Sequence, residues 1–393
     1  MKVAIIIERY DISLGGAEWL VFELTSALSL LGIDVDILAA RGDSSEANVR
    51  ILRQNDNSKR ISLASFAKLT SNFTGRNHYD IIHSLIPLTF ADVYQPPGGS
   101  FAEAIIRNAA SYRNKLVFAY KRATALTNWR RTEMLWAEKK LCRNPNGPII
   151  AALSNYVKDQ FIRHYNLDGE RIALVPNGVK VDNQVDAGIA EKLKMQIFQQ
   201  LEIESSANPV FFLFGANNFR LKGLNVLAEA LVLLEKSSTH RTPYLIVAGG
   251  GKINKFRSLA KNMNLDKRIV FLGHLPHIQN AMSISDVAVL PTFYDPCSRY
   301  ILEALAACKP VITTKFNGAS DFFVNNRHGK VIDNPENINA LAEAIRYFTD
   351  SKNIENASHA IIEDNLKENI SIGRAARQLI DVFESILQKK GRK

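Results

Sequence analysis

Two carboxylates flank one short helical stretch in FYDPCSRYILEAL, residues 293–305. Asp295 follows the apolar run DVAVLP, and Glu303 comes eight positions later, between Leu302 and Ala304. Apolar neighbours on both sides argue that Glu303 does not simply face solvent. Because carboxylates accept hydrogen bonds from hydroxyl groups, the pair suits a ligand that carries a ribose and a hexose. The structural alternative is that Asp295 caps the helix and Glu303 forms a salt bridge.

Two cations occupy a comparable position in FGANNFRLKG, residues 214–223. An apolar run ends at Gly215, and Arg220 and Lys222 stand where the next helical stretch begins. Charge-assisted hydrogen bonds and the helix dipole together favour a diphosphate at such a point. Two solvated loop charges would give the same pattern.

A glycine pair follows the first apolar run, in YDISLGGAEW, residues 10–19. Gly15 and Gly16 open a helical stretch, where free N–H groups favour phosphate and glycine lets the backbone approach it. The spacing matches neither the dinucleotide fingerprint nor the P-loop. A turn that only needs positive φ would use the same residues.

An irregular loop, IIHSLIPLTFADVYQPPGGS at residues 81–100, is the last candidate. His83 ends a strand, Asp92 lies within the loop, and Gly98 and Gly99 follow two prolines. Irregular loops above a sheet often carry function, although a lone histidine is more often structural.

Short β-branched runs alternate with amphipathic stretches along the chain, which predicts parallel sheets covered by helices. The alternation restarts after PNGV, residues 176–179, and 393 residues suit two domains. We therefore predict an α/β protein of two doubly wound, Rossmann-like domains facing across a cleft. The domains cover residues 1–180 and 181–371, and the last helix, within 372–393, is able to pack back on the first. Ligands then bind at the carboxyl ends of the strands.

One tempting metal motif falls at the wrong edge of the predicted sheet. Asp34-Val35-Asp36 spells the DxD of metal-dependent nucleotide-sugar enzymes, but it begins a strand, at the amino end. Alternation of Ile33, Val35 and Ile37 explains it better, so no metal is predicted.

The composition indicates a soluble globular protein with an anionic partner. Hydrophobic residues make up 46%, charged residues 22%, and the net charge is +10. Three irregularly spaced cysteines indicate no disulfide framework, and the first apolar run is too short for a signal peptide. No run reaches the ~18 residues of a membrane span. We expect a cytoplasmic protein, peripheral on the membrane.

The basic stretch at residues 105–143 interleaves arginines and lysines with Tyr112, Phe118, Tyr120, Trp129 and Trp136. Basic helices with aromatic residues suit an anionic membrane surface. Solvated helices are the simpler alternative, and no nucleic-acid motif accompanies the stretch.

Together these motifs resemble the family 4 retaining glycosyltransferases of the GT-B fold, most like the lipopolysaccharide core glucosyltransferases. The resemblance rests on GGAE, RLKG, PNGV, and an acidic residue that is separated by seven residues from a Glu followed by A-x-A-x-x-x-P-V-I-T. It implies transfer of a hexose, glucose, from a UDP-sugar to a lipid-linked or lipopolysaccharide-core glycan, with no cofactor and no metal.

The resemblance also implies residue roles. Donor binding falls to Gly15, Gly16, Gly215, Ser298, Leu302 and Glu303. Catalytic roles, including neutralisation of the diphosphate by the two cations, fall to Asp92, Arg220, Lys222 and Asp295. The acceptor region contains His83, Gly98 and Gly99. Asp295 stands where the family usually has Glu, and Cys297-Ser298 replaces Phe-Gly, so the donor sugar is left open.

Other functions remain compatible with the same residues. A nucleotide-sugar 2-epimerase of this fold would need no acceptor, and a mannosyltransferase would use GDP-mannose. A non-catalytic protein that binds a membrane or nucleic acid would keep the basic stretch but would not need the acidic pair.

Overall fold

A computed structural model describes residues 1–11, 16–42, 46–53, 61–181, 185–204, 207–235 and 239–391. The chain divides into two compact units. The first unit contains residues 1–109, 116–178 and 372–393, and the second contains residues 110–115 and 179–371. The division after Gly178 lies two residues from the boundary expected from the sequence, and the C-terminal segment joins the first unit.

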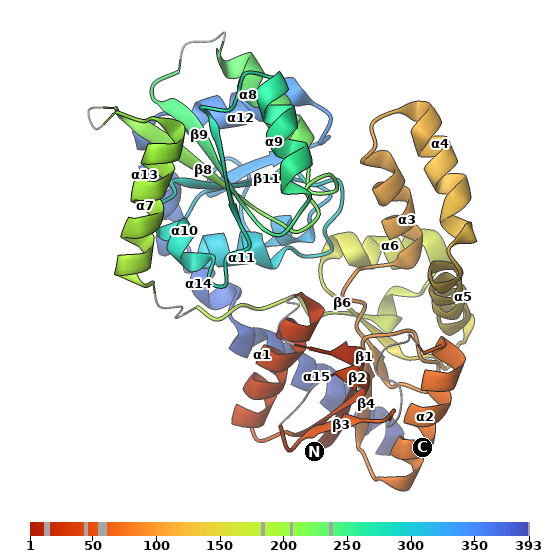
Figure 1. Ribbon diagram of the computed structural model, residues 1–393. Helices are drawn as coiled ribbons and strands as arrows, with labels where there is room; N and C mark the ends of the chain where they lie inside the picture. The colour runs from red at the N-terminus through yellow and green to blue at the C-terminus, as the bar shows by residue number, and fades with distance from the viewer. Residues whose placement is uncertain are drawn as a thin grey trace. The chain divides into compact units, whose positions relative to one another are not determined.

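The first unit is built on a parallel sheet in the order β3-β2-β1-β4-β5-β6-β7 (Figure 1). Its strands are β1 (Lys2–Tyr10), β2 (Asp34–Gly42), β3 (Val49–Ile51), β4 (Ile81–Ser84), β5 (Val93–Tyr94), β6 (Ile149–Ala152) and β7 (Ile172–Leu174). Its helices are α1 (Ala17–Leu30), α2 (Leu63–Arg76), α3 (Phe101–Ala110), α4 (Lys115–Thr124), α5 (Trp129–Arg143), α6 (Asn155–Tyr165) and α15 (Ile372–Gly391).

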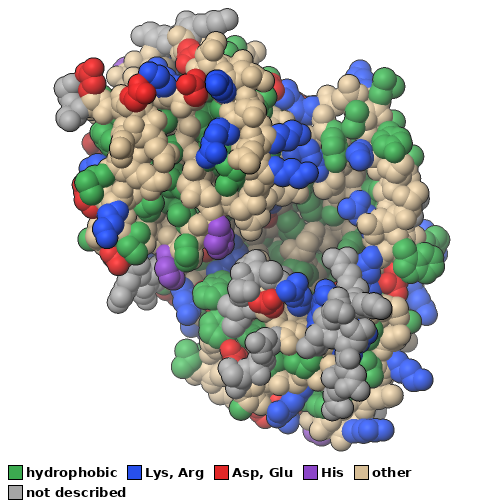
Figure 2. All heavy atoms as spheres, viewed as in Figure 1, with side chains coloured by type: hydrophobic (Ala, Val, Ile, Leu, Met, Phe, Trp, Pro, Cys, Tyr) green, Lys and Arg blue, Asp and Glu red, His purple; other side chains and the backbone are tan. Residues whose placement is uncertain are grey.

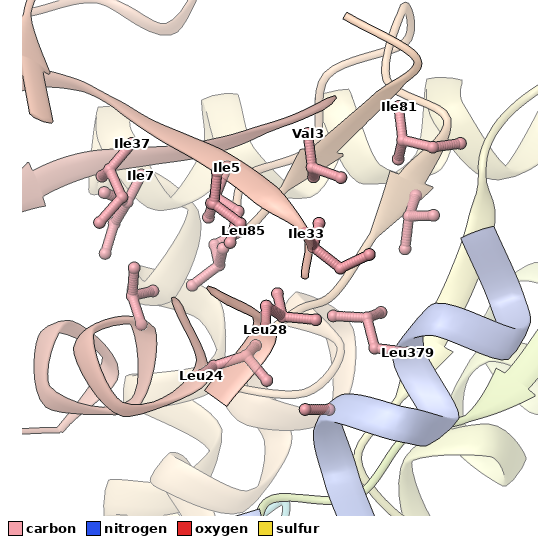
Figure 3. Close-up of a cluster of buried hydrophobic side chains, with 14 of the residues drawn as sticks. Val3, Ile5, Ile7, Leu24, Leu28, Ile33, Ile37, Ile81, Leu85 and Leu379 are labelled. Carbon is pink, nitrogen blue, oxygen red and sulfur yellow. The ribbon is translucent and has the colours of Figure 1, made fainter. Parts of the chain in front are cut away.

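Alternation along β1 supplies two cores, one on each face of the sheet. Val3, Ile5 and Ile7 pack with α1 and α15, while Ala4 and Ile6 pack on the opposite face. Figure 3 shows side chains of α1 and Leu379 of α15 meeting the strand residues of the first face. A strand buried on both faces requires a helical layer on each side, which is the doubly wound arrangement.

The second unit repeats this plan with the strand order β10-β9-β8-β11-β12-β13. Its strands are β8 (Pro209–Gly215), β9 (Thr242–Ala248), β10 (Ile269–Gly273), β11 (Val287–Leu290), β12 (Val311–Thr314) and β13 (Gly329–Ile332). Its helices are α7 (Ala187–Leu201), α8 (Leu224–Glu235), α9 (Ile253–Asn262), α10 (Gln279–Ser283), α11 (Arg299–Ala306), α12 (Ile338–Tyr347), α13 (Ser351–Glu363) and α14 (Leu366–Asn369). The predicted fold class, α/β with two Rossmann-like domains, is confirmed.

Each sheet has one point where the direction of winding reverses, between β1 and β4 in the first unit and between β8 and β11 in the second. At such a switch point the loops after the two strands leave in opposite directions, which opens a crevice at the carboxyl edge. Within the described residues, no helix is both long and apolar enough to cross a membrane.

His83 of β4 packs into the first core, where its ring lies 5.9 Å from that of Phe383 on α15. The side chain is fully buried, and burial lowers its pKa to about 4. Its pKa in the unfolded chain is near the ordinary ~6.5, so between these values the unfolded state binds the extra proton. The histidine therefore reduces stability as the pH falls below about 6.5.

We predict that His83→Leu flattens this acid dependence. Between pH 7 and pH 5 the wild type should lose about 2 kcal/mol of unfolding free energy through His83, and the variant should not. Urea denaturation at both values measures the difference. The matched control, His359→Leu, replaces an exposed histidine of α13 and should behave as the wild type. An unchanged acid dependence in His83→Leu would contradict the assignment.

Candidate active site

Two glycines of FGANNFRLKG pack the loop after β8 tightly against its neighbours. A Cβ on Gly215 would come within 2.6 Å of the Tyr300 ring, whose hydroxyl donates to the Leu213 carbonyl at 2.5 Å. Gly223 has φ +87°, and a Cβ there would lie 2.1 Å from the carbonyl oxygen of Pro291. The glycines are needed because α11 and the end of β11 lie directly against this loop.

This packing brings Lys222 and Asp295 together at the switch point of the second unit. The Lys222 Nζ donates to Asp295 Oδ2 at 2.6 Å and to the Tyr294 carbonyl at 3.0 Å. Both side chains are mostly buried. A cation and a carboxylate from the loops after β8 and β11 therefore form one preorganised pair.

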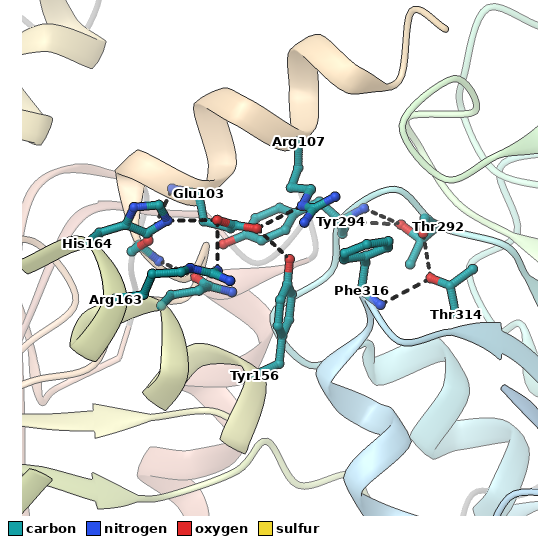
Figure 4. Close-up of polar contacts among 11 residues, drawn as sticks. Glu103, Arg107, Tyr156, Arg163, His164, Thr292, Tyr294, Thr314 and Phe316 are labelled. Carbon is teal, nitrogen blue, oxygen red and sulfur yellow. Dashed lines mark hydrogen bonds and ion pairs between the residues drawn. The ribbon is translucent and has the colours of Figure 1, made fainter. Parts of the chain in front are cut away.

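Hydroxyl groups hold the Asp295 loop in place (Figure 4). The Thr314 hydroxyl donates to the Thr292 carbonyl at 2.6 Å, and the Thr292 hydroxyl donates to the Tyr294 carbonyl at 2.9 Å. The backbone N–H of Asp295 donates to the Phe316 carbonyl at 2.9 Å. These bonds satisfy buried polar groups near the site, and so fix its backbone.

Asn317, which is fully buried, ties this loop to the start of α11. Its Oδ1 accepts hydrogen bonds from the backbone N–H groups of Ser298 and Ala319, each at 3.1 Å. Ser298 is the residue that precedes the first turn of α11. The side chain therefore positions the helix that carries Glu303. Asn317 was not among the residues predicted for the site, although it closely follows the apolar run VITT, at the edge of the sheet where ligands bind.

Glu303 lies in the second turn of α11, 3.7 Å from Arg299 of the first turn. Both side chains are mostly buried, whereas Leu302 and Ala304 are completely buried. The ion pair expected under the structural alternative is thus present, and the ribose-binding role stays a prediction. The Leu302 side chain belongs to the core, so only its backbone could contribute to a donor site.

Arg220 stacks on an aromatic ring in the second unit. Its guanidinium carbon lies 3.9 Å from the ring centre of Tyr112, and the group also donates to the Ser111 hydroxyl. Burial lowers the pKa of Arg220. Stacking fixes the plane of the guanidinium without neutralising its charge.

The first unit contains a cavity of about 520 Å³ at the carboxyl edge of its sheet. Gly98 and Gly99 line it together with Tyr94 and Phe101, and the acceptor role expected for the two glycines stays a prediction. Gly99 has φ +66°, and its N–H closes a turn onto the Pro96 carbonyl at 3.1 Å. The loop thus forms one wall of the cavity.

Two buried glutamates hold this wall. Glu138 of α5 accepts hydrogen bonds from the Tyr94 hydroxyl at 2.9 Å and the Phe101 N–H at 2.8 Å, and burial raises its pKa to about 7. Glu103 of α3 pairs with Arg107 and His164, each at 2.7 Å (Figure 4). Burial alone would raise the pKa of Glu103, but its hydrogen bonds from His164 and Arg107 lower it to about 2.

Two predicted residues lie away from these sites. Asp92 precedes β5 at the amino end of the sheet, where it accepts from the Ile82 N–H at 2.9 Å and pairs with Lys390 of α15 at 2.7 Å. Its position joins β4, β5 and α15, and this edge of a parallel sheet is the wrong one for catalysis. His83 is a core residue and does not line the cavity. The structure therefore lends no support to the roles predicted for these two residues.

The glycine pair is described only in part. Gly15 lies outside the described residues. Gly16 precedes α1 with φ +69°, a conformation that glycine adopts without strain. The prediction of a phosphate contact at this helix start remains a prediction.

Two family models match the two halves of the chain. Residues 14–183 match Glycosyltransferase Family 4, and residues 196–368 match Glycosyl transferases group 1. The chain therefore belongs to the family 4 type of glycosyltransferases with the GT-B fold, which confirms the resemblance found in its motifs.

Individual proteins agree with this placement. Lipopolysaccharide glucosyltransferase WaaG of Escherichia coli (strain K12) is 28% identical over 187 residues, covering 47% of this chain and 49% of that protein. UDP-Gal:alpha-D-GlcNAc-diphosphoundecaprenol alpha-1,3-galactosyltransferase of Escherichia coli is 27% identical over 205 residues, covering 52% and 51%. The chain spans about half the length of these curated relatives.

A solved structure matches over the whole fold. The crystal structure of WaaG, a glycosyltransferase involved in lipopolysaccharide biosynthesis, has a TM-score of 0.67 and 20% identity. The match covers 99% of this chain and 98% of that one. At this identity the likeness establishes the fold.

We predict that Gly223→Ala destabilises the second unit by about 2 kcal/mol or more. A side chain at φ +87° is strained, and its Cβ would collide with the Pro291 carbonyl. The matched control is Gly250→Ala, where a Cβ would make only an ordinary contact of 3.6 Å with Asn217. Urea denaturation followed by fluorescence compares the two. Equal midpoints would show that the loop is not packed as described.

Proposed function

We propose that the protein transfers a hexose, glucose, from a UDP-sugar to a lipid-linked or lipopolysaccharide-core glycan, with retention of configuration. The observation that carries the proposal is the Lys222–Asp295 pair at the switch point, beside the helix that bears Glu303. The names of the two relatives supply the chemistry: one is a glucosyltransferase of lipopolysaccharide, and the other is named for a UDP-sugar donor and a lipid-diphosphate acceptor.

Each group would act on a different part of the donor. Lys222 and Arg220 would bind the diphosphate and stabilise its growing negative charge as the bond to the sugar breaks. Asp295, which fixes the Lys222 ammonium at 2.6 Å, would accept hydrogen bonds from sugar hydroxyls with its remaining lone pairs. Glu303 would hold the ribose. In this proposal the two cations take the place that a metal ion has in other transferases.

The leading alternative within the fold is a nucleotide-sugar 2-epimerase, which would turn over UDP-N-acetylglucosamine without an acceptor. A GDP-mannose-dependent mannosyltransferase would use the same pair of loops with another base and sugar. Donor binding and acceptor dependence separate these activities.

We predict that calorimetry finds one preferred nucleotide among UDP, GDP, UDP-glucose, UDP-N-acetylglucosamine and GDP-mannose, with UDP and UDP-glucose binding best. Lys222→Ala and Glu303→Ala should each weaken that binding by about tenfold or more, because each removes a charge-assisted hydrogen bond. Lys194→Ala, the same change at an exposed position of α7, should have no effect.

The proposed donor site would be wrong if the protein bound none of these nucleotides. It would also be wrong if all three variants bound the preferred nucleotide with equal affinity. A product formed from UDP-N-acetylglucosamine without acceptor would favour the epimerase. The anomeric configuration of the transferred sugar, read by NMR, tests retention separately.

The proposal includes contact with an anionic membrane, because the acceptor is a lipid. Large side chains stand out on α4 and α5: Leu116 is 82% exposed, Tyr120 63%, Trp129 80% and Trp136 61%. On α5, Trp129, Trp136, Lys140 and Arg143 are exposed at helical spacing, with Lys139 5.2 Å from the Trp136 ring centre. Figure 2 shows hydrophobic and basic side chains intermixed where α4 and α5 lie. Such a surface suits the membrane interface.

We predict that Trp129→Ala combined with Trp136→Ala weakens binding to phosphatidylglycerol-containing vesicles roughly tenfold or more, because both rings lose burial in the interface. Sedimentation with vesicles measures the partition. The control, Trp19→Ala, removes a less exposed tryptophan of α1 and should leave partition unchanged. Equal partition of the double variant and the wild type would place the membrane contact elsewhere.

A further inference from the structure

The cavity of the first unit carries arginines from two neighbouring strands. Arg9 of β1 and Arg41 of β2 are register partners in the parallel sheet, so their side chains leave the same face side by side. Both line the cavity near the carboxyl ends of their strands. Neither residue was singled out from the sequence, because 32 positions separate them.

Most of the charges in this cavity are already compensated. Arg130 of α5 pairs with Glu8 at 2.5 Å and with Glu133 at 2.8 Å. Arg9 pairs with Asp11 at 2.7 Å. Of the arginines that line the cavity, these ion pairs account for Arg9 and Arg130 but not for Arg41.

Arg41 contributes a buried hydrogen-bond donor to this cavity. Its Nε is buried and makes no hydrogen bond to any described residue. Leaving a buried donor of a charged group unpaired is costly, and a bound acceptor would remove that cost. Since a guanidinium presents a planar fork of donors, the fitting acceptor is a phosphate or a carboxylate.

The remaining cavity walls define what else the ligand carries. Glu18 of α1 lines the same cavity, and its carboxyl oxygens can accept hydrogen bonds from hydroxyls. Ile86, Phe101 and Met134 add apolar wall. A hydroxylated ring that bears an anionic group would place its anion on Arg41, its hydroxyls on Glu18 and its ring on the apolar side chains. A neutral sugar would leave the Arg41 Nε without an acceptor.

We propose that Arg41 is a specificity-determining residue that selects an acceptor sugar carrying a phosphate or carboxylate group. The inference rests on the proposed transferase function, since it names the class of its acceptor. The alternative source of the anion is the nucleotide, because the Arg41 Nε can also donate a hydrogen bond to a nucleotide phosphate. The test must therefore separate a nucleotide phosphate from an anionic group of the acceptor.

The test titrates the full chain with glucose, glucose 6-phosphate, glucuronate and UDP by calorimetry. We expect glucose 6-phosphate or glucuronate to bind at least about tenfold more tightly than glucose, and Arg41→Gln to abolish that preference while UDP affinity stays unchanged. Arg76→Gln, which removes an exposed arginine of α2, should preserve the preference. Equal binding of glucose and both anionic sugars, or no binding of any of the three, overturns the proposal.

Loss of UDP affinity in Arg41→Gln, with the sugar preference intact, would assign the arginine to the donor and also overturn the proposal. If wild-type protein fails to bind UDP, the transferase proposal fails by itself, whatever the sugar series shows. A second measurement avoids dependence on the variant's folding: phenylglyoxal modification of wild-type Arg41, followed by mass spectrometry. Glucose 6-phosphate should slow this modification and glucose should not, and equal rates would contradict the assignment.

Discussion

Parallel pairing between β8 and β11 is the constraint on which the second unit's candidate site depends. The register sets Phe212 beside Val287, so the two strands end close together while the chain winds away from them in opposite directions. The loops that follow must then share one crevice. Gly223 permits the backbone contact with Pro291, and that contact brings the Lys222 ammonium to the Asp295 carboxylate.

The first unit uses the same topology but stabilises its site differently. Two buried carboxylates position the helices around its cavity, and their pKa values shift in opposite directions. Glu103 receives cationic partners, which outweigh burial and hold its pKa at about 2. Glu138 receives only neutral hydroxyl and amide donors, so burial dominates and raises its pKa to about 7. The partner's charge, more than burial itself, decides the outcome.

Two site predictions in the segment at residues 81–100, those for Asp92 and His83, find no support in the structure, for two different reasons. The irregular composition of this segment suggested a long functional loop, but a two-residue strand, β5, begins at Val93. That strand places Asp92 at the amino end of the sheet and leaves Gly98 and Gly99 at the opposite edge. A strand this short has no periodicity to detect. His83 lies in a strand of a sheet that is covered by helices on both faces, so its side chain is buried whichever face it presents.

Local patterns in the sequence determined the fold class, the two-domain plan and the motifs around Asp295 and Lys222, because apolar periodicity and glycine spacing are properties of neighbouring residues. Tertiary structure alone decided which of those residues meet. The Lys222–Asp295 pair spans 73 positions, and the Arg9–Arg41 neighbours depend on strand register. Register is fixed by burial of whole strand faces, and one residue of slip would turn every side chain to the other side. Likewise, only the tertiary structure shows that the buried Nε of Arg41 has no hydrogen-bond partner among the described residues.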